Sequence, residues 1–425
     1  MNSLYKKVIL NGLKKGRIGK IRIQLADRTT IECGVADCEY APTLSVHNDA
    51  FFTELAHKGG VGLGEAYQRG YWSSSHLTET LQWLLKNSPY FASDVSPYFA
   101  SIARWANAAL SGMLHFRNRN NIDGSRSNIH AHYDLGNSFY ETFLDPSLTY
   151  SSAYFQSESY SLEQAQEEKY DRLCRKLDIC STSHVLEIGC GWGGFALYAA
   201  QRYNCCVTGT TISKEQYDRA CQRVREAGLE DRIDITMTDY RKLQGTYDRI
   251  VSIEMLEAVG EEYLGAYFKQ VESLLEPNGL AGIQVITCPN PLYDEYKTRV
   301  DWIQKHIFPG SHLPSTHALI ENAESSGSLD LYHLESFGLH YARTLKEWRI
   351  RFLEKWNAIQ PMGFDDAFKR KWEYYLAYCE AGFAQRHVNV CQLVFGRADE
   401  TAYRNEMRTK TKQELPNPYP SCAAI

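Results

Sequence analysis

The stretch Glu187-Ile188-Gly189-Cys190-Gly191-Trp192-Gly193-Gly194 decides the fold of this chain. The short segment 183–187 that leads into it predicts a strand, and the segment 195–203 that leaves it predicts a helix. Glycines at such a junction let the backbone approach a ligand closely, and they leave amide N–H groups at a helix N-terminus free to bind it. In open α/β sheets, ligands bind at the carboxyl ends of the strands. The stretch therefore predicts a ligand site at one edge of an α/β sheet.

Strand and helix patterns alternate outward from this stretch. The predicted strands are 183–187, 206–209, 233–236, 247–253 and 279–286, the last after a Pro-Asn-Gly turn at 277–279, and the predicted helices are 195–203, 214–228 and 262–275. This order predicts an α/β fold with a mostly parallel, Rossmann-like sheet and helices on both faces.

The ligand that the glycine stretch binds can be narrowed further. An acidic residue followed by glycines in the order E-x-G-x-G-x-G resembles the signature of class I S-adenosylmethionine methyltransferases. A dinucleotide site and a purely structural turn are the alternatives. The second predicted strand ends in Thr210-Thr211-Ile212-Ser213, without the acidic residue that a dinucleotide site places on the ribose, which disfavours the first alternative. Asp239, after the third strand, can accept a hydrogen bond from an adenine amino group or can serve as a helix N-cap.

Length and charge indicate two domains of different character. The chain has 425 residues, which favours more than one domain. We expect a small α+β domain at 1–115, with a strand at 21–25 and a glycine-rich turn at 59–64. We further expect a linker at 116–130, a catalytic domain at 131–400 and a loose tail at 401–425. Residues 1–130 carry 15 Lys and Arg against 10 Asp and Glu, or +5, and the remainder carries 31 against 41. A basic N-terminal domain favours an anionic lipid surface, although ordinary surface variation explains the charge equally well.

Cysteine usage and hydropathy bear on the cellular location. The twelve cysteines are scattered, and the pair Cys33 and Cys38 has no second pair at zinc-ligand spacing, so we predict no metal. Free thiols fit a reducing cytosol. Neither a signal peptide nor an apolar run of membrane-spanning length is visible. We expect a cytoplasmic protein that associates transiently with the inner face of the membrane and does not bind nucleic acid. The sequence leaves open whether it forms a homodimer.

Further motifs connect the glycine stretch to a known family. They are 132–137 (HYDLGN), 148–154 (LTYSSAY), 211–216 (TISKEQ), 252–260 (SIEMLEAVG) and 307–310 (IFPG), with a weaker motif at 62–72. Together they resemble the cyclopropane-fatty-acyl-phospholipid synthases and the related mycolic acid cyclopropane synthases over residues 130–400. The resemblance implies transfer of a methylene unit from S-adenosylmethionine to the cis double bond of an unsaturated phospholipid acyl chain at a membrane surface.

The resemblance also assigns residues. Around S-adenosylmethionine it places Tyr150, Ser151, Gly189, Cys190, Gly191, Gly193, Thr211, Gln216 and Asp239. Around a bound bicarbonate ion it places Glu257, Ile286 and Tyr341. An alkene that attacks a sulfonium methyl leaves a carbocation in the acyl chain, so the site must be dry, and a base must remove a proton from the new methyl group. Glu257 as a helix-start carboxylate and Tyr341 as a core residue are the structural alternatives.

Three positions depart from the family pattern. Ser152 stands where a cysteine is usual, Ala258 where a histidine often follows the glutamate, and Gln284 where a histidine often joins the ion site. Gln284 can still donate to bicarbonate and Ser152 can still form hydrogen bonds, and the combination resembles the plant-type synthase domain. If the proton leaves after a hydride shift, however, the product is a methylene or methyl branch and not a ring.

Two further functions remain in competition. A methyltransferase for a small amine or phenol is disfavoured because a small substrate needs no membrane-docking domain. A catalytically silent lipid-binding protein is disfavoured by the intact glycine stretch together with Glu257 and Tyr341.

Overall fold

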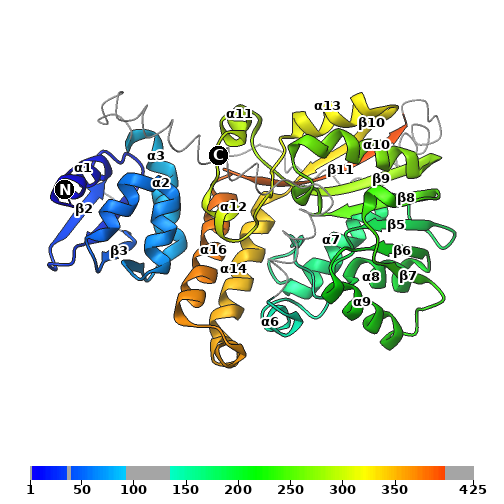
Figure 1. Ribbon diagram of the computed structural model, residues 1–425, viewed down its shortest axis with the longest axis horizontal. Coiled ribbons are helices and arrows are strands. Elements are labelled where there is room, and N and C mark those ends of the chain that lie inside the picture. Colours follow the sequence, from blue (N-terminus) through cyan, green and yellow to red (C-terminus); the bar gives the residue numbers. More distant parts are fainter. Residues whose placement is uncertain (1, 36–39, 92–134, 398–425) are drawn as a thin grey trace, which may run out of the picture.

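The computed structural model describes residues 2–35, 40–91 and 135–397. Within it, a small N-terminal unit and a larger α/β unit are joined through a helical layer (Figure 1). The N-terminal elements are β1 (Lys20–Gln24), β2 (Thr30–Gly34), β3 (Thr43–Val46), β4 (Trp72–Ser74), α1 (Asn2–Leu13), α2 (Ala50–Gln68) and α3 (Leu77–Phe91). Their strands form a mixed sheet in the order β2-β1-β3-β4. The predicted strand at 21–25 matches β1 to within one residue, and its alternating residues Ile21 and Ile23 are buried.

The larger unit is built on a seven-stranded sheet in the order β10-β11-β9-β8-β5-β6-β7. Its strands are β5 (His184–Ile188), β6 (Cys206–Thr210), β7 (Ile233–Thr236), β8 (Tyr247–Ile253), β9 (Leu275–Thr287), β10 (Leu329–Ser336) and β11 (Asn389–Arg397). The five strands from β5 to β9 run parallel, and β11 pairs antiparallel with both β9 and β10. The predicted mostly parallel α/β sheet is therefore confirmed, with an antiparallel edge that the sequence did not predict.

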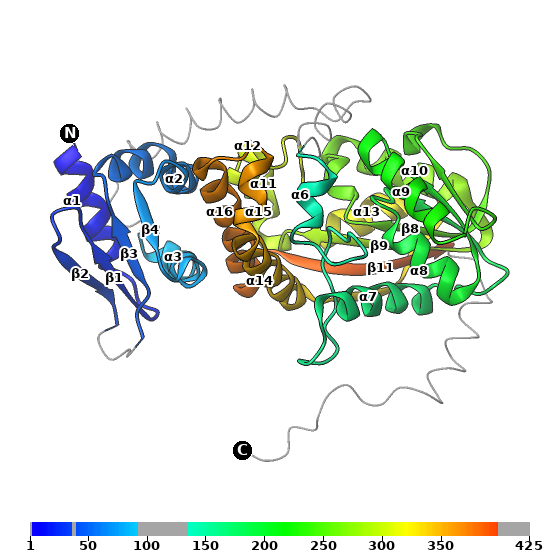
Figure 2. The ribbon, with the colours of Figure 1, turned by 90° about the horizontal axis from the view of Figure 1, so that it is seen from below.

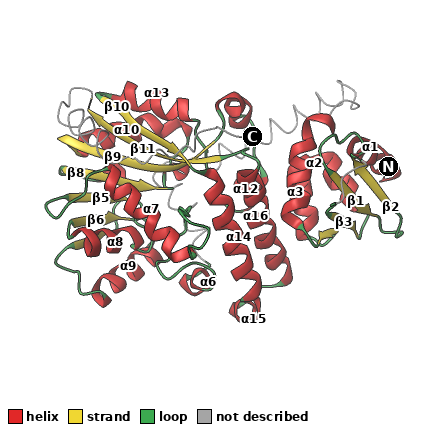
Figure 3. Ribbon diagram, turned by 180° about the vertical axis from the view of Figure 1, so that it is seen from behind, coloured by secondary structure: helices red, strands yellow, loops and turns green. Residues whose placement is uncertain are grey.

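Helices cover both faces of this sheet (Figure 3). The helices of the unit are α6 (Asn137–Glu141), α7 (Leu162–Lys176), α8 (Gly194–Tyr203), α9 (Lys214–Glu226), α10 (Leu264–Leu274), α11 (Tyr293–Lys297), α12 (Trp302–His306), α13 (Thr316–Ser326), α14 (Gly338–Glu354), α15 (Trp356–Ile359) and α16 (Asp366–Ala384). One core lies between the sheet and α7, α8 and α9, and another lies between the sheet and α10 and α13. Because both faces are covered, β11 is buried almost throughout its length.

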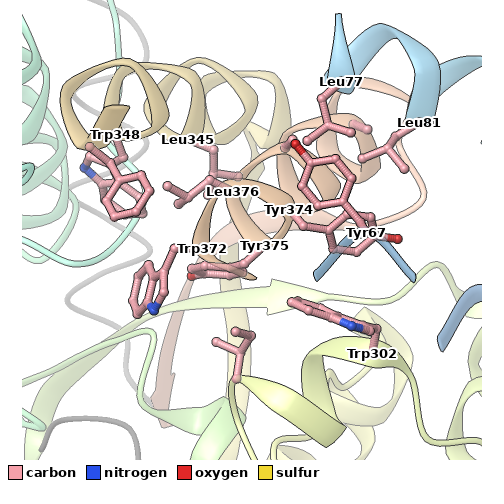
Figure 4. Close-up of a cluster of buried hydrophobic side chains, with 14 of the residues drawn as sticks. Tyr67, Leu77, Leu81, Trp302, Leu345, Trp348, Trp372, Tyr374, Tyr375 and Leu376 are labelled. Carbon is pink, nitrogen blue, oxygen red and sulfur yellow. The ribbon is translucent and has the colours of Figure 1, made fainter. Parts of the chain in front are cut away.

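Helices α14 and α16 lie between the sheet and the N-terminal unit (Figures 1 and 2). Helix α16 packs against α2 and α3. The junction is rich in aromatic side chains, among them Tyr67, Trp302 and Tyr374 (Figure 4). Polar contacts cross it as well: the Tyr67 hydroxyl donates to Glu373 at 3.0 Å, and Lys305 pairs with the buried carboxylate of Glu65 at 2.5 Å.

The glycine-rich turn predicted at 59–64 is wrong. These residues lie inside α2, which bends at Gly59, where φ is 53°. A Cβ at Gly64 would lie 2.5 Å from the Trp302 ring and 2.7 Å from Tyr374, so this glycine permits close packing of α2 against α12 and α16. The glycines suggested a turn, but Gly64 is required here because a side chain would clash with neighbouring rings.

Two predicted boundaries near β9 also change. The Pro-Asn-Gly segment at 277–279, predicted as a turn before the strand, lies within β9, which pairs with β8 through a register shift. The helix predicted at 262–275 is shorter, because a 3-10 turn at Glu261–Tyr263 precedes α10. The predicted linker at 116–130 and tail at 401–425 lie outside the described residues, so the domain boundaries stay predictions. Among the described residues, no helix combines the length and apolar character that crossing a bilayer requires.

Candidate active site

The glycine stretch forms the turn between β5 and α8. Gly189, Gly191 and Gly193 all have positive φ, at 84°, 52° and 79°, a region that residues with a Cβ rarely adopt. The amides of Gly189 and Cys190 both donate to the Thr210 carbonyl at 2.9 Å, which fixes the turn to the end of β6. A Cβ built at Gly191 meets no atom within 4 Å, because this residue borders a cavity of about 1240 Å³.

A buried carboxylate lies at the start of this turn. Glu187 lines the cavity, and its Oε2 atom has no hydrogen-bond partner among the residues that the structure describes. Burial raises the pKa of Glu187 to about 8, against a smaller opposing effect of Lys169. A cationic ligand would relieve the burial cost of an unpaired carboxylate. S-adenosylmethionine carries both an ammonium and a sulfonium group, so the glycine turn and Glu187 fit it.

Most of the residues predicted to bind the cofactor share this cavity. Those that line it are Tyr150, Ser151, Gly189, Cys190, Gly191, Thr211 and Gln216. Thr211 donates to the Gln216 side chain at 2.9 Å, which holds the two together. Gly193 and Asp239 are not among the residues that line the cavity. Gly193 is the N-cap of α8, and Asp239 is the N-cap of the 3-10 turn at Tyr240–Lys242.

The Asp239 carboxylate has a partner of its own. It accepts hydrogen bonds from the Arg241 side chain at 2.8 and 2.7 Å and from the Arg241 amide at 3.0 Å. The N-cap role that the sequence allowed is therefore present, and the predicted adenine contact stays a prediction. The neighbouring Thr238 and Tyr240 do line the cavity.

A second acidic group lies deeper in the same cavity, directly after β8. Glu254 accepts hydrogen bonds from the Tyr341 hydroxyl at 2.7 Å, the Gln284 side-chain amide at 2.8 Å and the Ser152 backbone amide at 2.8 Å. Tyr341, Gln284 and Ser152, three of the five residues that the sequence connected with catalysis together with Glu257 and Ile286, thus gather around Glu254, which the sequence analysis did not single out. Burial raises the pKa of Glu254, and the hydrogen bonds from Tyr341, Gln284 and Ser152 oppose that rise.

The other two predicted catalytic residues form a separate contact beside it. The Ile286 amide donates to Glu257 Oε1 at 2.5 Å. Glu257 Oε2 is buried, with no hydrogen-bond partner in the described part of the chain. Burial, and then the nearby charge of Glu254, raise the pKa of Glu257 well above that of an ordinary carboxyl group. Three donors surround the Glu254 carboxylate and one donor contacts that of Glu257, so the hydrogen bonds favour the negative charge on Glu254.

Two residues of the site gave different signals in the sequence. Glu254 was visible, because it follows a predicted strand and stands three residues before Glu257 in one motif. Lys169 gave none: it lies in the highly charged helix α7, yet it is fully buried and donates to the Ser151 hydroxyl at 2.8 Å. Burial lowers the pKa of Lys169 to about 7.

Aromatic side chains from α14 and α16 also line the cavity, among them Tyr341, Tyr375 and Phe383. The Tyr341 ring stacks on Phe383 with centroids 4.3 Å apart, and the Tyr150 ring lies 5.2 Å from that of Trp348. The Tyr150 and Tyr375 hydroxyls bond each other at 2.9 Å, which leaves their rings as an apolar surface. The cavity continues to the N-terminal unit, where residues 58–61 of α2 line it. Such a space combines a polar end with a long apolar wall.

Comparisons with known proteins agree with this geometry. The family model for mycolic acid cyclopropane synthetase matches residues 121–393. The tuberculostearic acid methyltransferase UfaA1 of Mycobacterium tuberculosis is 38% identical over 88% of this chain and 86% of its own length. The cyclopropane-fatty-acyl-phospholipid synthase of Escherichia coli is 35% identical over 90% of this chain and 95% of its own.

A solved structure is similar as well. The mycolic acid cyclopropane synthase CmaA1, determined in complex with SAH and CTAB, superposes with a TM-score of 0.59 at 30% identity, covering 64% of this chain and 97% of that one. The chain is therefore an S-adenosylmethionine-dependent methyltransferase that belongs to the mycolic acid cyclopropane synthetase family.

Proposed function

We propose that this enzyme transfers a methylene unit from S-adenosylmethionine to the cis double bond of an unsaturated phospholipid acyl chain and forms a cyclopropane ring. The observation that carries the proposal is one continuous cavity of about 1240 Å³. It joins the glycine turn of Gly189 and Gly191 to a carboxylate cluster and then to an aromatic wall. The names of the Escherichia coli relative and of CmaA1 with SAH support the same reaction class.

The chain's own residues bind the cofactor, exclude water from the acyl chain and provide carboxylate charge. S-adenosylmethionine, when bound, supplies an electrophilic methyl group. The backbone of the glycine turn and the unpaired Glu187 would hold it. The rings of Tyr150, Tyr341 and Phe383 exclude water from the reacting acyl chain, so a cation formed there is not quenched. Aromatic faces also stabilise a nearby cation by about 0.5–2 kcal/mol.

A methyl- or methylene-branched chain is the second candidate product. The comparison with the tuberculostearic acid methyltransferase favours this product. That relative is 38% identical to this chain, slightly more than the cyclopropane synthase of Escherichia coli at 35%. Both products begin with the same methyl transfer and differ in which bond the remaining electron pair forms.

Incubation with labelled S-adenosylmethionine and vesicles tests the proposal. Vesicles of a cis-monounsaturated phosphatidylglycerol should gain one CH₂ per modified chain, and matched saturated vesicles should gain none. Ring and exo-methylene products have equal mass, so proton NMR must separate them: ring methylene signals support the cyclopropane, and olefinic methylene signals support the branch. Label in a small amine, or in no product at all, would contradict lipid modification.

We also propose that α1 docks the enzyme to an anionic membrane. Leu4 and Val8, one turn apart, are 63% and 44% exposed, and Lys7 lies exposed on the same face. Residues 2–26 contain seven Lys and Arg and no Asp or Glu. Helix α1 packs on α2, whose residues 58–61 line the cavity. An apolar stripe flanked by cations matches the interface of an anionic bilayer.

Bicarbonate, the ion that the resemblance implies, does not fit the residues present. Two of its expected partners, Gln284 and Tyr341, already donate to Glu254, as does the Ser152 backbone amide, and the Ile286 amide donates to Glu257. A further anion here would lie against a buried carboxylate, and these neighbouring donors are already engaged. We therefore derive no step through bicarbonate.

A further inference from the structure

A carboxylate of the chain itself occupies the polar end of the cavity. Glu254 accepts three hydrogen bonds of 2.7–2.8 Å, two of them from Tyr341 and Gln284, which the family resemblance connects with the ion site, and one from the Ser152 backbone amide. The three donors come from distant parts of the chain, namely the segment before α7, strand β9 and helix α14. Their convergence on one side chain holds its oxygens in a fixed position within the cavity.

The backbone of Glu254 indicates that this placement is specific. Its φ is 49°, in the left-handed region, which is uncommon for residues other than Gly, Asn and Asp. Such a conformation costs about 1–3 kcal/mol and persists where the surrounding structure imposes it, often at an active site. The strained turn directs the carboxylate into the cavity that holds the glycine turn and the aromatic wall.

We propose that Glu254 is the proton acceptor of this enzyme and stands in place of a bicarbonate ion. The inference rests on the proposed function, since it presupposes a methylated acyl cation. Glu254 is suited to the role because burial makes it a stronger base than a carboxylate in water. The Tyr341 hydroxyl and the Gln284 side-chain amide then act as positioning groups, which orient the carboxylate.

Methyl transfer to the alkene comes first, and removal of a proton follows. The alkene π pair forms a bond to the methyl carbon, the carbon–sulfur bond breaks, and sulfur keeps its pair and becomes a neutral thioether. The positive charge is left on the neighbouring acyl carbon. A Glu254 oxygen takes a proton from the new methyl group, and the released C–H pair closes the ring or, after a hydride shift, forms an exo-methylene bond. The proton remains on Glu254 until it passes to water after the product has left.

The test compares wild type, Glu254→Gln and Glu254→Gly in buffer stripped of carbon dioxide, with and without added bicarbonate. Glu254→Gly is well suited because a glycine adopts φ of 49° without strain and frees the three donors. Glu230→Gln, at an exposed position away from the cavity, is the matched control. Lipid product, S-adenosylmethionine affinity by calorimetry and bicarbonate binding by carbon-13 NMR are measured for each protein.

We expect wild-type turnover to be independent of bicarbonate and wild type to show no bicarbonate binding. Glu254→Gln should lose about 10²–10⁴-fold in turnover with unchanged cofactor affinity. Glu254→Gly should bind bicarbonate and recover activity when it is added. A wild type that modifies lipid only when bicarbonate is present would overturn the inference, as would full activity in Glu254→Gln. A wild type without lipid product under any condition would instead overturn the proposed function.

Discussion

Gly191 combines a strained backbone with a place in the cavity wall. Replacement by valine would force φ of 52° on a β-branched residue and would fill space that faces the cofactor. We therefore expect Gly191→Val to abolish S-adenosylmethionine binding measured by calorimetry. Gly228 is a matched control, since it has φ of 65° and equally open surroundings but lies after α9, away from the cavity. Equal loss of binding in both variants would contradict the site assignment.

Glu257 should make stability depend on pH. Its pKa is raised in the folded state, so its contribution to stability is full below the ordinary carboxyl pKa and is lost as pH rises through the folded value. Wild type should lose more unfolding free energy between pH 5 and pH 8 than Glu257→Gln, by up to about 1.4 kcal/mol for each pH unit in which the folded and unfolded states differ by one proton. Urea unfolding at several pH values measures this. Parallel curves for the two proteins would mean that Glu257 is ionised when folded.

At the residue scale, the cofactor turn could be predicted, whereas Glu254 stood in a recognised motif but its role could not be predicted. The glycines are required by backbone conformation, which leaves a local signature at 189–193. The role of Glu254 depends on a left-handed residue and on donors from three distant segments. Spacing within one motif does not reveal such a convergence, and the family pattern directed attention to Glu257.

At the element scale, Gly64 controls the packing of α2. A Cβ there would contact Trp302 and Tyr374 below ordinary van der Waals distance. We expect Gly64→Ala to lower the free energy of unfolding by about 1–3 kcal/mol, as overpacked sites do. Gly60→Ala, in the same helix but with no atom within 4 Å, should change it by about 1 kcal/mol or less and in the stabilising direction. Urea denaturation measures the free energy of unfolding of both variants. A Gly64→Ala variant as stable as wild type would show that the two units separate easily.

The parallel strands were predictable because short, mostly apolar runs of four to eight residues end in turn residues. Strands β10 and β11 were missed, since they lie far along the chain beyond several short helices. Helix α2 was mistaken for a turn because glycine favours turns locally, whereas here it makes room for tryptophan and tyrosine rings from another unit.

At the scale of the whole molecule, α1 should determine membrane affinity. Exchanging Leu4 and Val8 together for serine removes the exposed apolar stripe. This should weaken binding to anionic vesicles by about 1.4 kcal/mol or more, about tenfold in the partition coefficient, in a sedimentation assay. Binding of wild type should also fall as salt is raised. Met237→Ser, an exposed change in the α/β unit, is the control. Unaltered sedimentation of the double variant would place the docking surface elsewhere.

The length of the chain favoured two domains, whose boundaries stay predictions, but the way in which the two units of the structure pack could not be predicted. The cavity draws its walls from α2, from α14 and α16 and from the sheet edge, so its shape depends on how the units pack. Sequence motifs mark the polar end of the cavity, where Gly189, Gly191 and Glu254 have backbone conformations with positive φ. The apolar end consists of ordinary core residues, which carry no distinguishing pattern.

The most direct test of the central claim follows deuterium from methyl-deuterated S-adenosylmethionine into an unsaturated phospholipid. A methyl group reaches the acyl chain and then gives up one hydrogen to the protein. The modified chain should therefore contain two deuterons on its added carbon by mass spectrometry, whether the product is a ring or a methylene branch. Retention of all three deuterons, or an acyl chain without deuterium, would contradict the account.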